Sequence, residues 1–354
     1  MKKLIKLLIT CILCIMAVGV LYFAGVLLYG TLSEFNPDTM EELTIENNQI
    51  LNPDSGQISV LTWNIGYGGL GKEMDFFYEG GKLVRPSKQQ SEKYIQGISQ
   101  FLANHDSVDI MLLQEVDFKS KRSYQANELK FLQEKLPAYG SDYAVNYKSA
   151  FVPVPFSEPM GKVFSGLAVF SKYKIDTAIR VATPGSHAWP KRLFTLKRCF
   201  VVNHIPIENS DKKLVVINVH NSAFGDEEEF RKAELKLLRE YLLQEFEAGN
   251  YVIAGGDWNQ NPPGFDNTQM EKYTSRVGWP IETDYLPPDW TWSWDPSLPT
   301  NRDVKTPFDL QATQCTILDY FVTSPNIDVL NIQTIDLDFE NSDHQPVIIN
   351  LKLI

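Results

Sequence analysis

Polar side chains that could bind a metal ion or move a proton follow short apolar runs at several places along the 354-residue chain. Each apolar run has the length and composition of a buried strand, and the ends of neighbouring strands meet at one edge of a sheet. Carboxylates, amide oxygens and water are the ligands that Mg²⁺ prefers, and histidine and aspartate commonly perform acid–base chemistry. The side chains concerned are Asn64, Glu115, His220, Asp257, Asn259, Asp319, Asp343 and His344.

Each of these residues has an ordinary explanation when it is taken alone. An asparagine or aspartate after a strand is usually a turn residue. Glu115 could be an exposed loop carboxylate, and His220 could be a buried core histidine. Six strand-end segments with such side chains are harder to explain as unrelated turns. We therefore expect the polar residues to form one site.

In chain order, the segments around these residues resemble the endonuclease/exonuclease/phosphatase family, which includes pancreatic-type deoxyribonucleases, abasic-site endonucleases, neutral sphingomyelinases and inositol-polyphosphate 5-phosphatases. Order and rough spacing agree from about Ile58 to the C-terminus. The resemblance implies a divalent-metal-dependent hydrolase of phosphate esters with an α/β fold, a four-layer sandwich of two mixed sheets flanked by helices. The matching segments are Thr62-Trp63-Asn64, Leu113-Gln114-Glu115-Val116, Asn218-Val219-His220, Gly256-Asp257-Trp258-Asn259, Leu318-Asp319-Tyr320 and Ser342-Asp343-His344-Gln345-Pro346.

The resemblance also implies a role for each residue. Glu115 and Asn64 are the expected ligands of Mg²⁺ or Mn²⁺, with Asp343 as a third ligand. Such an ion would polarise a phosphoryl oxygen and neutralise the developing charge.

The remaining residues are expected to be catalytic. Asp257 and Asn259 would orient the attacking water or hold the phosphoryl group. His344, oriented by Asp319, is a candidate general base or transition-state stabiliser, and His220 would bind a phosphoryl oxygen or assist the leaving group. Either Asp257 or His344 could take the proton in this scheme.

Two features depart from the family pattern. The family often has arginine two residues before the aspartate of its fifth motif, where this chain has Ile317. Arg302 could take that place if the intervening loop folds back. The long segment Gly66–Ser91 is expected to form a lid or substrate loop, since connections of this length are usually functional or mobile.

The rest of the chain after Gln57 alternates short apolar runs with helical patterns, which is typical of one α/β domain, residues 57–354. Two helical patterns stand out, one around Tyr94–Leu102 and one over Phe230–Phe246 that should end at Gly249. The expected strands are Ile58–Trp63, Val108–Leu113, Gly166–Ser171, Leu214–Val219, Tyr251–Ala254, Ile317–Val322 and Pro346–Leu351.

The N-terminal segment, residues 1–31, is long enough to span a membrane. Leu7–Tyr29 has 23 residues and no charge, and a bilayer core needs about 20 apolar helical residues. This run is longer than the apolar region of a cleavable signal peptide, which favours an uncleaved signal anchor. Lysines precede the run and acidic residues follow it, so we expect a single-pass cell-membrane protein with its catalytic domain on the extracytoplasmic side. Residues 32–56 would form a tether.

Composition limits the function further. The net charge is −11, whereas proteins that bind duplex nucleic acid usually carry a basic surface. An active-site metal could still supply positive charge locally, so a nucleic-acid substrate is not excluded. The four cysteines are too few for a disulfide scaffold. Cys199 and Cys315 are expected to be buried thiols rather than a disulfide.

The substrate is the least determined part of the prediction. We expect a phosphodiesterase acting on lipid or nucleic acid. The alternatives are a phosphomonoesterase of a polyphosphorylated small molecule and an inactive surface binding module; no protein partner is implied. Trp290, Trp292 and Trp294 could touch lipid or stack on bases, although tryptophans that cap the core are the more ordinary interpretation. Several basic residues could receive phosphate or simply be solvated: Lys82, Arg85, Lys191, Arg192 and Arg302.

Overall fold

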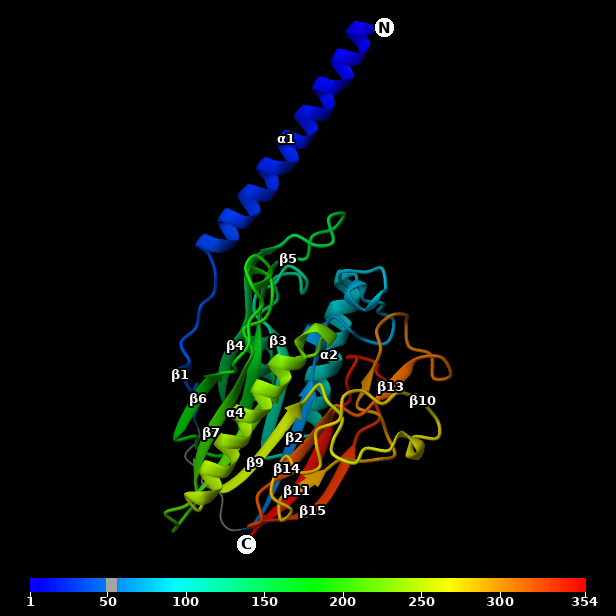
Figure 1. The fold of residues 1–354 in the computed structure, drawn as a ribbon. Coiled ribbons are helices and arrows are strands. Elements are labelled where there is room, and N and C mark those ends of the chain that lie inside the picture. Colours follow the sequence, from blue (N-terminus) through cyan, green and yellow to red (C-terminus); the bar gives the residue numbers. More distant parts are fainter. Residues whose placement is uncertain (49–55) are drawn as a thin grey trace.

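The computed structural model describes residues 1–48 and 56–354. Two large β-sheets pack face to face, and helices cover their outer faces (Figure 1). A long N-terminal helix rises from one end of this domain, and the C-terminus lies at the opposite end (Figure 1). The predicted α/β sandwich of two mixed sheets is therefore confirmed.

Within the described residues, the first sheet has seven strands in the spatial order β1-β6-β7-β8-β9-β14-β11. Most neighbours are antiparallel, but β8 and β9 are parallel. The strands are β1 (Met40–Glu42), β6 (Thr177–Ala182), β7 (Cys199–Pro206), β8 (Lys213–His220), β9 (Tyr251–Asp257), β14 (Asp319–Thr323) and β11 (Thr291–Ser293).

The second sheet, counted over the same part of the chain, has six strands in the order β15-β16-β2-β3-β5-β4, with β2 and β3 parallel. A small third sheet has the order β10-β13-β12. The strands are β15 (Ile327–Thr334), β16 (Val347–Leu353), β2 (Gln57–Asn64), β3 (Ile110–Asp117), β5 (Gly161–Ser171), β4 (Gly140–Val152), β10 (Thr274–Ser275), β13 (Gln314–Thr316) and β12 (Asn301–Arg302).

The helices form the two outer layers. α2 (Lys88–Asn104) and α3 (Glu128–Lys135) pack on the six-stranded sheet, and α4 (Glu228–Glu247) packs on the seven-stranded sheet. α2 begins at a capping box, in which Ser87 Oγ accepts from the backbone N–H of Gln90 and the Gln90 side chain accepts from that of Ser87. α4 is followed by Gly249 at φ +84°, which agrees with the predicted end of this helix.

Alternation along the strands decides which side chains face the gap between the sheets. In β8, Leu214 and Val216 belong to the core between the sheets, whereas Val215 and Ile217 pack under α4. The same parity places the last residue of β8, His220, on the inner side. Polar residues at strand ends can therefore enter the gap only if they have the inner parity.

Each predicted strand overlaps an observed strand, with ends shifted by a few residues. Several strands of the structure were not predicted, among them β4, β6, β7 and β15. Their sequences mix polar and apolar residues without a clear period, because some polar side chains in them are buried between the sheets, such as Asn146 in β4 and Asn203 in β7.

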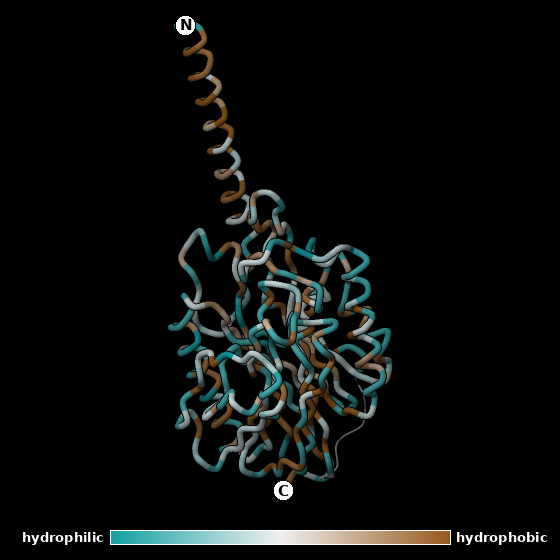
Figure 2. Tube along the Cα trace, turned by 90° about the vertical axis from the view of Figure 1, so that its right-hand side faces the viewer, coloured by the Kyte–Doolittle hydropathy of each residue, from teal (hydrophilic) through white to brown (hydrophobic). Residues whose placement is uncertain are grey.

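α1 (Lys2–Leu32) is, within the described residues, the one helix long and apolar enough to cross a membrane by length and composition. None of its side chains is buried, and it is apolar over most of its length (Figure 2). The following segment is attached to the domain: Met40–Glu42 pairs with β6, and Leu43 and Ile45 pack against the core. Residues 49–55 of the predicted tether lie outside the described residues, and the domain limits at 31 and 56 stay predictions.

The tryptophans and cysteines have the ordinary roles. Trp290 is only 5% exposed and packs edge-on against Phe246 of α4, while Trp292 and Trp294 cover the same cluster. All four cysteines lie in the described part of the chain and none forms a disulfide. Cys199 and Cys315 are buried thiols, as we expected.

Candidate active site

Three of the predicted site residues lie side by side on adjacent strands of the seven-stranded sheet. His220 ends β8, Asp257 ends β9 and Asp319 begins β14; in the strand register His220 pairs with Asp257 and Asp257 with Asp319. All three have the inner parity and are almost completely buried. A row of histidine and two aspartates is thus built into the edge of one sheet.

The second sheet contributes Asn64 at the end of β2. Its Nδ2 donates to Asp257 Oδ2 at 3.0 Å, which joins the two sheets at this edge. Its Oδ1 accepts from the backbone N–H of Gly66 at 3.0 Å. The amide is therefore held in one orientation.

Glu115 reaches the site because β3 is irregular there. By strict alternation Glu115 would follow Gln114 and point away from the gap. The pairing of β3 with β5 shifts between Leu113 and Val116, and Glu115 has φ +55°. Such a bulge re-aims a side chain, and Glu115 Oε1 lies 3.8 Å from His220 Nε2.

Asp319 orients His344. The Nδ1 atom of His344 lies 2.7 Å from Asp319 Oδ2, so Nδ1 carries the proton and Nε2 faces the site. Nε2 is 3.8 Å from Asp257 Oδ2. Burial alone would lower the pKa of His344, but the carboxylates of Asp319 and Asp257 outweigh it and hold this pKa well above its ordinary value.

His220 has the opposite electrostatic environment. Its Nε2 lies 3.6 Å from Asp257 Oδ2, and its Nδ1 lies 3.4 Å from the amide nitrogen of Asn146. Burial, reinforced by the cations Arg198 and His344, lowers the pKa of His220 well below its ordinary value. The environment therefore favours the neutral form of His220 and the protonated form of His344, although both face Asp257.

Asn259 supports Asp257 from two residues away. Its backbone N–H donates to Asp257 Oδ1 at 2.9 Å, and its side-chain amide donates to Asp257 Oδ2 at 3.1 Å. Burial raises the pKa of Asp257 to about 6, an effect that the positive charge of His344 partly opposes. Asn259 thus fixes the carboxylate of Asp257.

Asp343 lies on the loop that leads into β16. Burial, with the nearby charge of Glu115, raises its pKa to about 7. Both of its neighbours contact the site as well: Ser342 Oγ donates to the backbone oxygen of Asn64, and His344 follows directly. Two carboxylates, Asp343 and Glu115, are therefore near enough to repel each other.

Two groups of side chains in this edge could hold a cation. Asp257, Asp319 and His344 offer ligand atoms that all lie within 4.8 Å of one another. In this group His344 Nδ1 is already engaged by Asp319.

The other group is the predicted set of Asn64, Glu115 and Asp343, which offers only oxygen ligands and so suits a hard ion such as Mg²⁺. A Cβ atom on Gly66 would lie 3.0 Å from Asp343 Oδ1, so glycine keeps space open beside this set. Positive charge there would offset both the burial and the repulsion from Glu115 that raise the pKa of Asp343. The carboxylates of Glu115 and Asp343 fit a divalent ion, whereas Asn64 presents its Nδ2 to Glu115 Oε1 at 3.5 Å and would have to turn its oxygen toward the ion.

Arg302 meets the edge of the site through its backbone, whereas its guanidinium binds backbone carbonyls, so its place as the family's arginine stays a prediction. Its backbone N–H donates to the Asp343 carbonyl at 3.0 Å, and Nη2 donates to the carbonyls of Leu70 and Gly71 at 3.1 and 2.8 Å. It therefore fastens the start of the segment 66–91, in which Tyr67, Leu70 and Met74 form a small buried cluster.

Several of the other basic residues are engaged in ion pairs. Lys191 pairs with Asp226, and Arg192 pairs with Glu34. Arg85 lies 3.4 Å from Glu158. These pairs favour the interpretation of this set as structural or solvated charge.

Sequence reasoning missed two amides that contact the histidines. Asn146 Nδ2 lies 3.4 Å from His220 Nδ1, and Asn301 Nδ2 lies 3.1 Å from His344 Nε2. Asn146 belongs to β4, a strand without a clear sequence pattern. Asn301 stands beside Arg302, and the suggested return of Arg302 to the site was the one signal that could have found it.

The chain belongs to the endonuclease/exonuclease/phosphatase family, because the model of that family matches residues 61–344. It is thus an α/β protein of a family of phosphoesterases, and the sequence-based recognition is confirmed. A search among curated proteins finds no match.

Solved structures share the fold at low sequence identity. An endonuclease/exonuclease/phosphatase from Beutenbergia cavernae is 16% identical, with a TM-score of 0.52 over 84% of this chain and 72% of that one. The human Nocturnin catalytic domain with bound sulfate is 16% identical, with a TM-score of 0.51 over 88% and 98%. ANGEL2, described as a 2',3'-cyclic phosphatase, is 14% identical, with a TM-score of 0.55 over 88% and 99%.

Proposed function

We propose that this chain is a membrane-anchored, Mg²⁺-dependent phosphodiesterase that hydrolyses phosphate esters of lipid or nucleic acid. The observation that carries this proposal is the row His220–Asp257–Asp319 with His344 facing it, at the edge where both sheets meet. Family membership supports hydrolysis of a phosphate ester. Mn²⁺ could replace Mg²⁺ at an all-oxygen site.

The metal ligands in this proposal are Glu115, Asn64 and Asp343. When bound, the ion would polarise a phosphoryl oxygen and offset the charge that develops on it. Arg302 positions the backbone of Asp343 and the segment beside it.

The other side chains act on the phosphoryl group and the water. Asp257, fixed by Asn259, accepts a hydrogen bond from the attacking water and aims it at phosphorus. Asp257 and His344 both face this position. Because the pKa of His344 is held above its ordinary value, Asp257 takes the proton and the charged ring of His344 stabilises the transition state. His220 Nε2 donates to a phosphoryl oxygen, and its other ring nitrogen, Nδ1, faces the side-chain amide of Asn146.

The membrane anchor is α1. Most of its apolar side chains are exposed, and an apolar surface of this size is stable only when a bilayer or another protein covers it. The lysines at its start and the acidic flank after it favour an orientation with the catalytic domain on the extracytoplasmic side.

A direct assay tests this function. The full chain in detergent is given a soluble diester reporter (bis-p-nitrophenyl phosphate), the matching monoester, single-stranded DNA and a choline phospholipid, with Mg²⁺, with Mn²⁺ and with chelator. We expect diester hydrolysis that chelator abolishes and Mg²⁺ restores. Chelator-resistant turnover would refute the metal mechanism. Preference for the monoester, or no turnover of any substrate, would replace the proposal by a phosphomonoesterase or an inactive binding module, respectively.

A further inference from the structure

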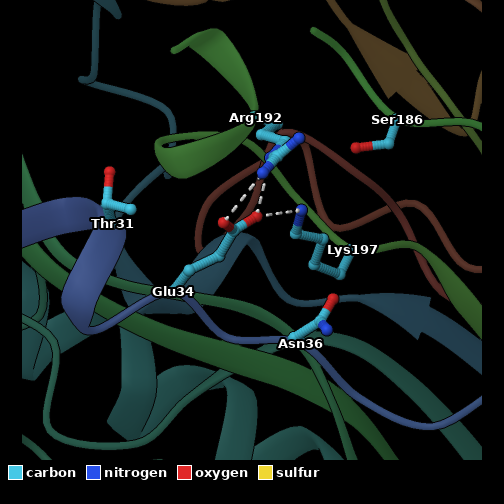
Figure 3. A pocket seen from close by; sticks show the side chains of 6 residues that line it. All are labelled: Thr31, Glu34, Asn36, Ser186, Arg192 and Lys197. Atoms are coloured by element: carbon cyan, nitrogen blue, oxygen red, sulfur yellow. Dashed lines mark hydrogen bonds and ion pairs between the residues drawn. The ribbon is translucent and has the colours of Figure 1, made fainter. Parts of the chain in front are cut away.

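The end of α1 is fastened to the catalytic domain rather than held away from it. Glu34, just after the helix, lies 3.1 Å from Arg192 Nε and 3.2 Å from Lys197 Nζ (Figure 3). Within the helix, Thr31 Oγ1 accepts from Trp189 Nε1 at 3.3 Å. The loop that connects β6 to β7, residues 183–198, therefore lies against the point where α1 ends.

A second loop lies beside α1, nearer to the N-terminus of the helix. The tip of the β4–β5 hairpin, residues 153–160, places the ring of Phe156 edge-on against Phe23, with centroids 5.7 Å apart. Phe23 precedes Tyr29, the last residue of the uncharged run, by six residues. At about 1.5 Å per residue, Phe156 lies about 9 Å beyond Tyr29 along the helix axis.

The first of these loops, residues 183–198, also contacts the active site. Lys197 donates its backbone N–H to the carbonyl of Asn146, whose side chain contacts His220. The next residue, Arg198, donates to the His220 carbonyl at 3.4 Å. Strand β9, which ends at Asp257, also points toward the end of the domain from which α1 rises (Figure 1).

From this geometry we infer that the two loops form a second membrane-contacting surface, and that the active site opens onto the headgroup layer of the bilayer that holds α1. The substrate is then a phosphate ester of a membrane lipid in that leaflet. This inference rests on the proposed function for its substrate, and on α1 as a membrane anchor for its geometry. If Tyr29 lies at the interface, Phe156 lies below the headgroups.

The surface is suited to a bilayer by its apolar side chains rather than by charge. Phe156 is 65% exposed and Trp189 is 52% exposed, and tryptophan is a side chain typical of membrane interfaces. The nearby cations Lys191 and Arg192 are each paired with an acid. Binding should therefore need no anionic lipid, and the acidic chain offers little to a polyanion such as nucleic acid.

A spin-label experiment tests the surface without any assay of activity. In the full chain with Cys11 and Cys14 replaced by serine, and with the buried Cys199 and Cys315 retained, Phe156→Cys is labelled with a nitroxide and reconstituted in phosphatidylcholine vesicles. Leu330→Cys on β15 is the matched control, because Leu330 is an exposed apolar residue on a strand away from α1 (Figure 1). We expect the label at 156 to be accessible to oxygen and shielded from a water-soluble nickel complex, and the label at 330 to show the reverse. A label at 156 as accessible to nickel as the control overturns the inference.

A second measurement tests the substrate. The double variant Phe156→Asp/Trp189→Asp in vesicles should lower the ratio of phospholipid turnover to soluble-diester turnover about tenfold, since charged side chains in place of the two rings would hold the loops away from the apolar part of the bilayer. Leu330→Asp should leave that ratio unchanged. An unchanged ratio in the double variant overturns lipid as the substrate. If the wild-type chain hydrolysed none of the substrates, that result would count against the proposed function. The spin-label result would still decide whether the two loops contact the membrane.

Discussion

His344 and Asp319 form the tightest contact in the candidate site, 2.7 Å between Nδ1 and Oδ2. Asp319 is fully buried, so water does not compete for this contact. A carboxylate in this place fixes the tautomer that leaves Nε2 toward the substrate. Substitutions at Asp319 and His344 therefore test the role proposed for His344.

Replacing this carboxylate by an amide should damage turnover more than stability. We expect Asp319→Asn to lower kcat about 100-fold or more, because a positioned acid–base group contributes roughly 10²–10⁴-fold. His344→Ala should lower it to a similar level, and the double variant should be little worse than either, since the two residues act as one unit. Steady-state kinetics with saturating Mg²⁺ measures this. Asp328→Asn, an exposed aspartate on β15, is the control. Full activity in His344→Ala would refute the proposed role of the pair.

Asp142, away from the site in β4, should make the protein less stable as pH rises. Burial raises its pKa to about 8 from an ordinary value near 3.8, and the amide of Asn203 opposes this rise only in part. A raised pKa means that the folded state favours the protonated form. Its contribution to stability is complete below about pH 4 and is lost as pH rises to about 8.

Asp142→Asn removes this titration because the amide stays neutral. At pH 8 we expect the variant to be more stable than the wild type by about 2 kcal/mol, and at pH 4 to differ little. Thermal unfolding at a series of pH values checks this, and Asp328→Asn should reproduce the wild-type profile. An Asp142 variant that is less stable at pH 8 would show that the carboxylate is stabilised in its charged form.

Among the elements, β9 depends on an unusual backbone at its end. Gly256 has φ +148°, and a Cβ atom there would lie 2.1 Å from the Val219 carbonyl oxygen of the neighbouring strand. Asp257 follows directly, so this close approach of β8 and β9 places the central carboxylate of the site.

Gly256→Ala should therefore destabilise the domain by about 3 kcal/mol or more, through both the forbidden backbone conformation and the clash. Gly264→Ala is the matched control: Gly264 also has positive φ, +72°, but nothing lies within 4 Å of the added Cβ. We expect that control to cost only about 1 kcal/mol. Urea unfolding of both variants measures the difference, and equal losses would mean that the steric contact is unimportant.

At the scale of the whole molecule, the end of α1 is joined to the loop 183–198, which also contacts Asn146 and His220. If α1 is an anchor, the chain isolated from cells should keep its N-terminal residues and stay in the membrane fraction after alkaline carbonate extraction. Intact mass measurement separates this from cleavage of a signal sequence, which would remove most of α1. Protease added to intact cells should digest the catalytic domain if it faces outward, and protection of the domain would reverse the proposed orientation.

Much of the site could be predicted from the sequence by itself. Strand-forming runs and the polar residues after them are local features, so Asn64, His220, Asp257 and Asp319 could be found without coordinates. The length and apolarity of residues 7–29 are local as well, and they identify the helix that the structure contains.

Only the tertiary structure decided how these residues are held together. Asn146 meets His220 across 74 positions and Asn301 meets His344 across 43, and no local pattern encodes such contacts. Glu115 depends on a bulge in β3 that alternation does not predict. The attachment of α1 to the loops 153–160 and 183–198 also comes from packing, through Phe23 with Phe156 and Glu34 with Arg192. Local periodicity determines which residues can form strands and helices, whereas the packing of two sheets determines which of their side chains meet.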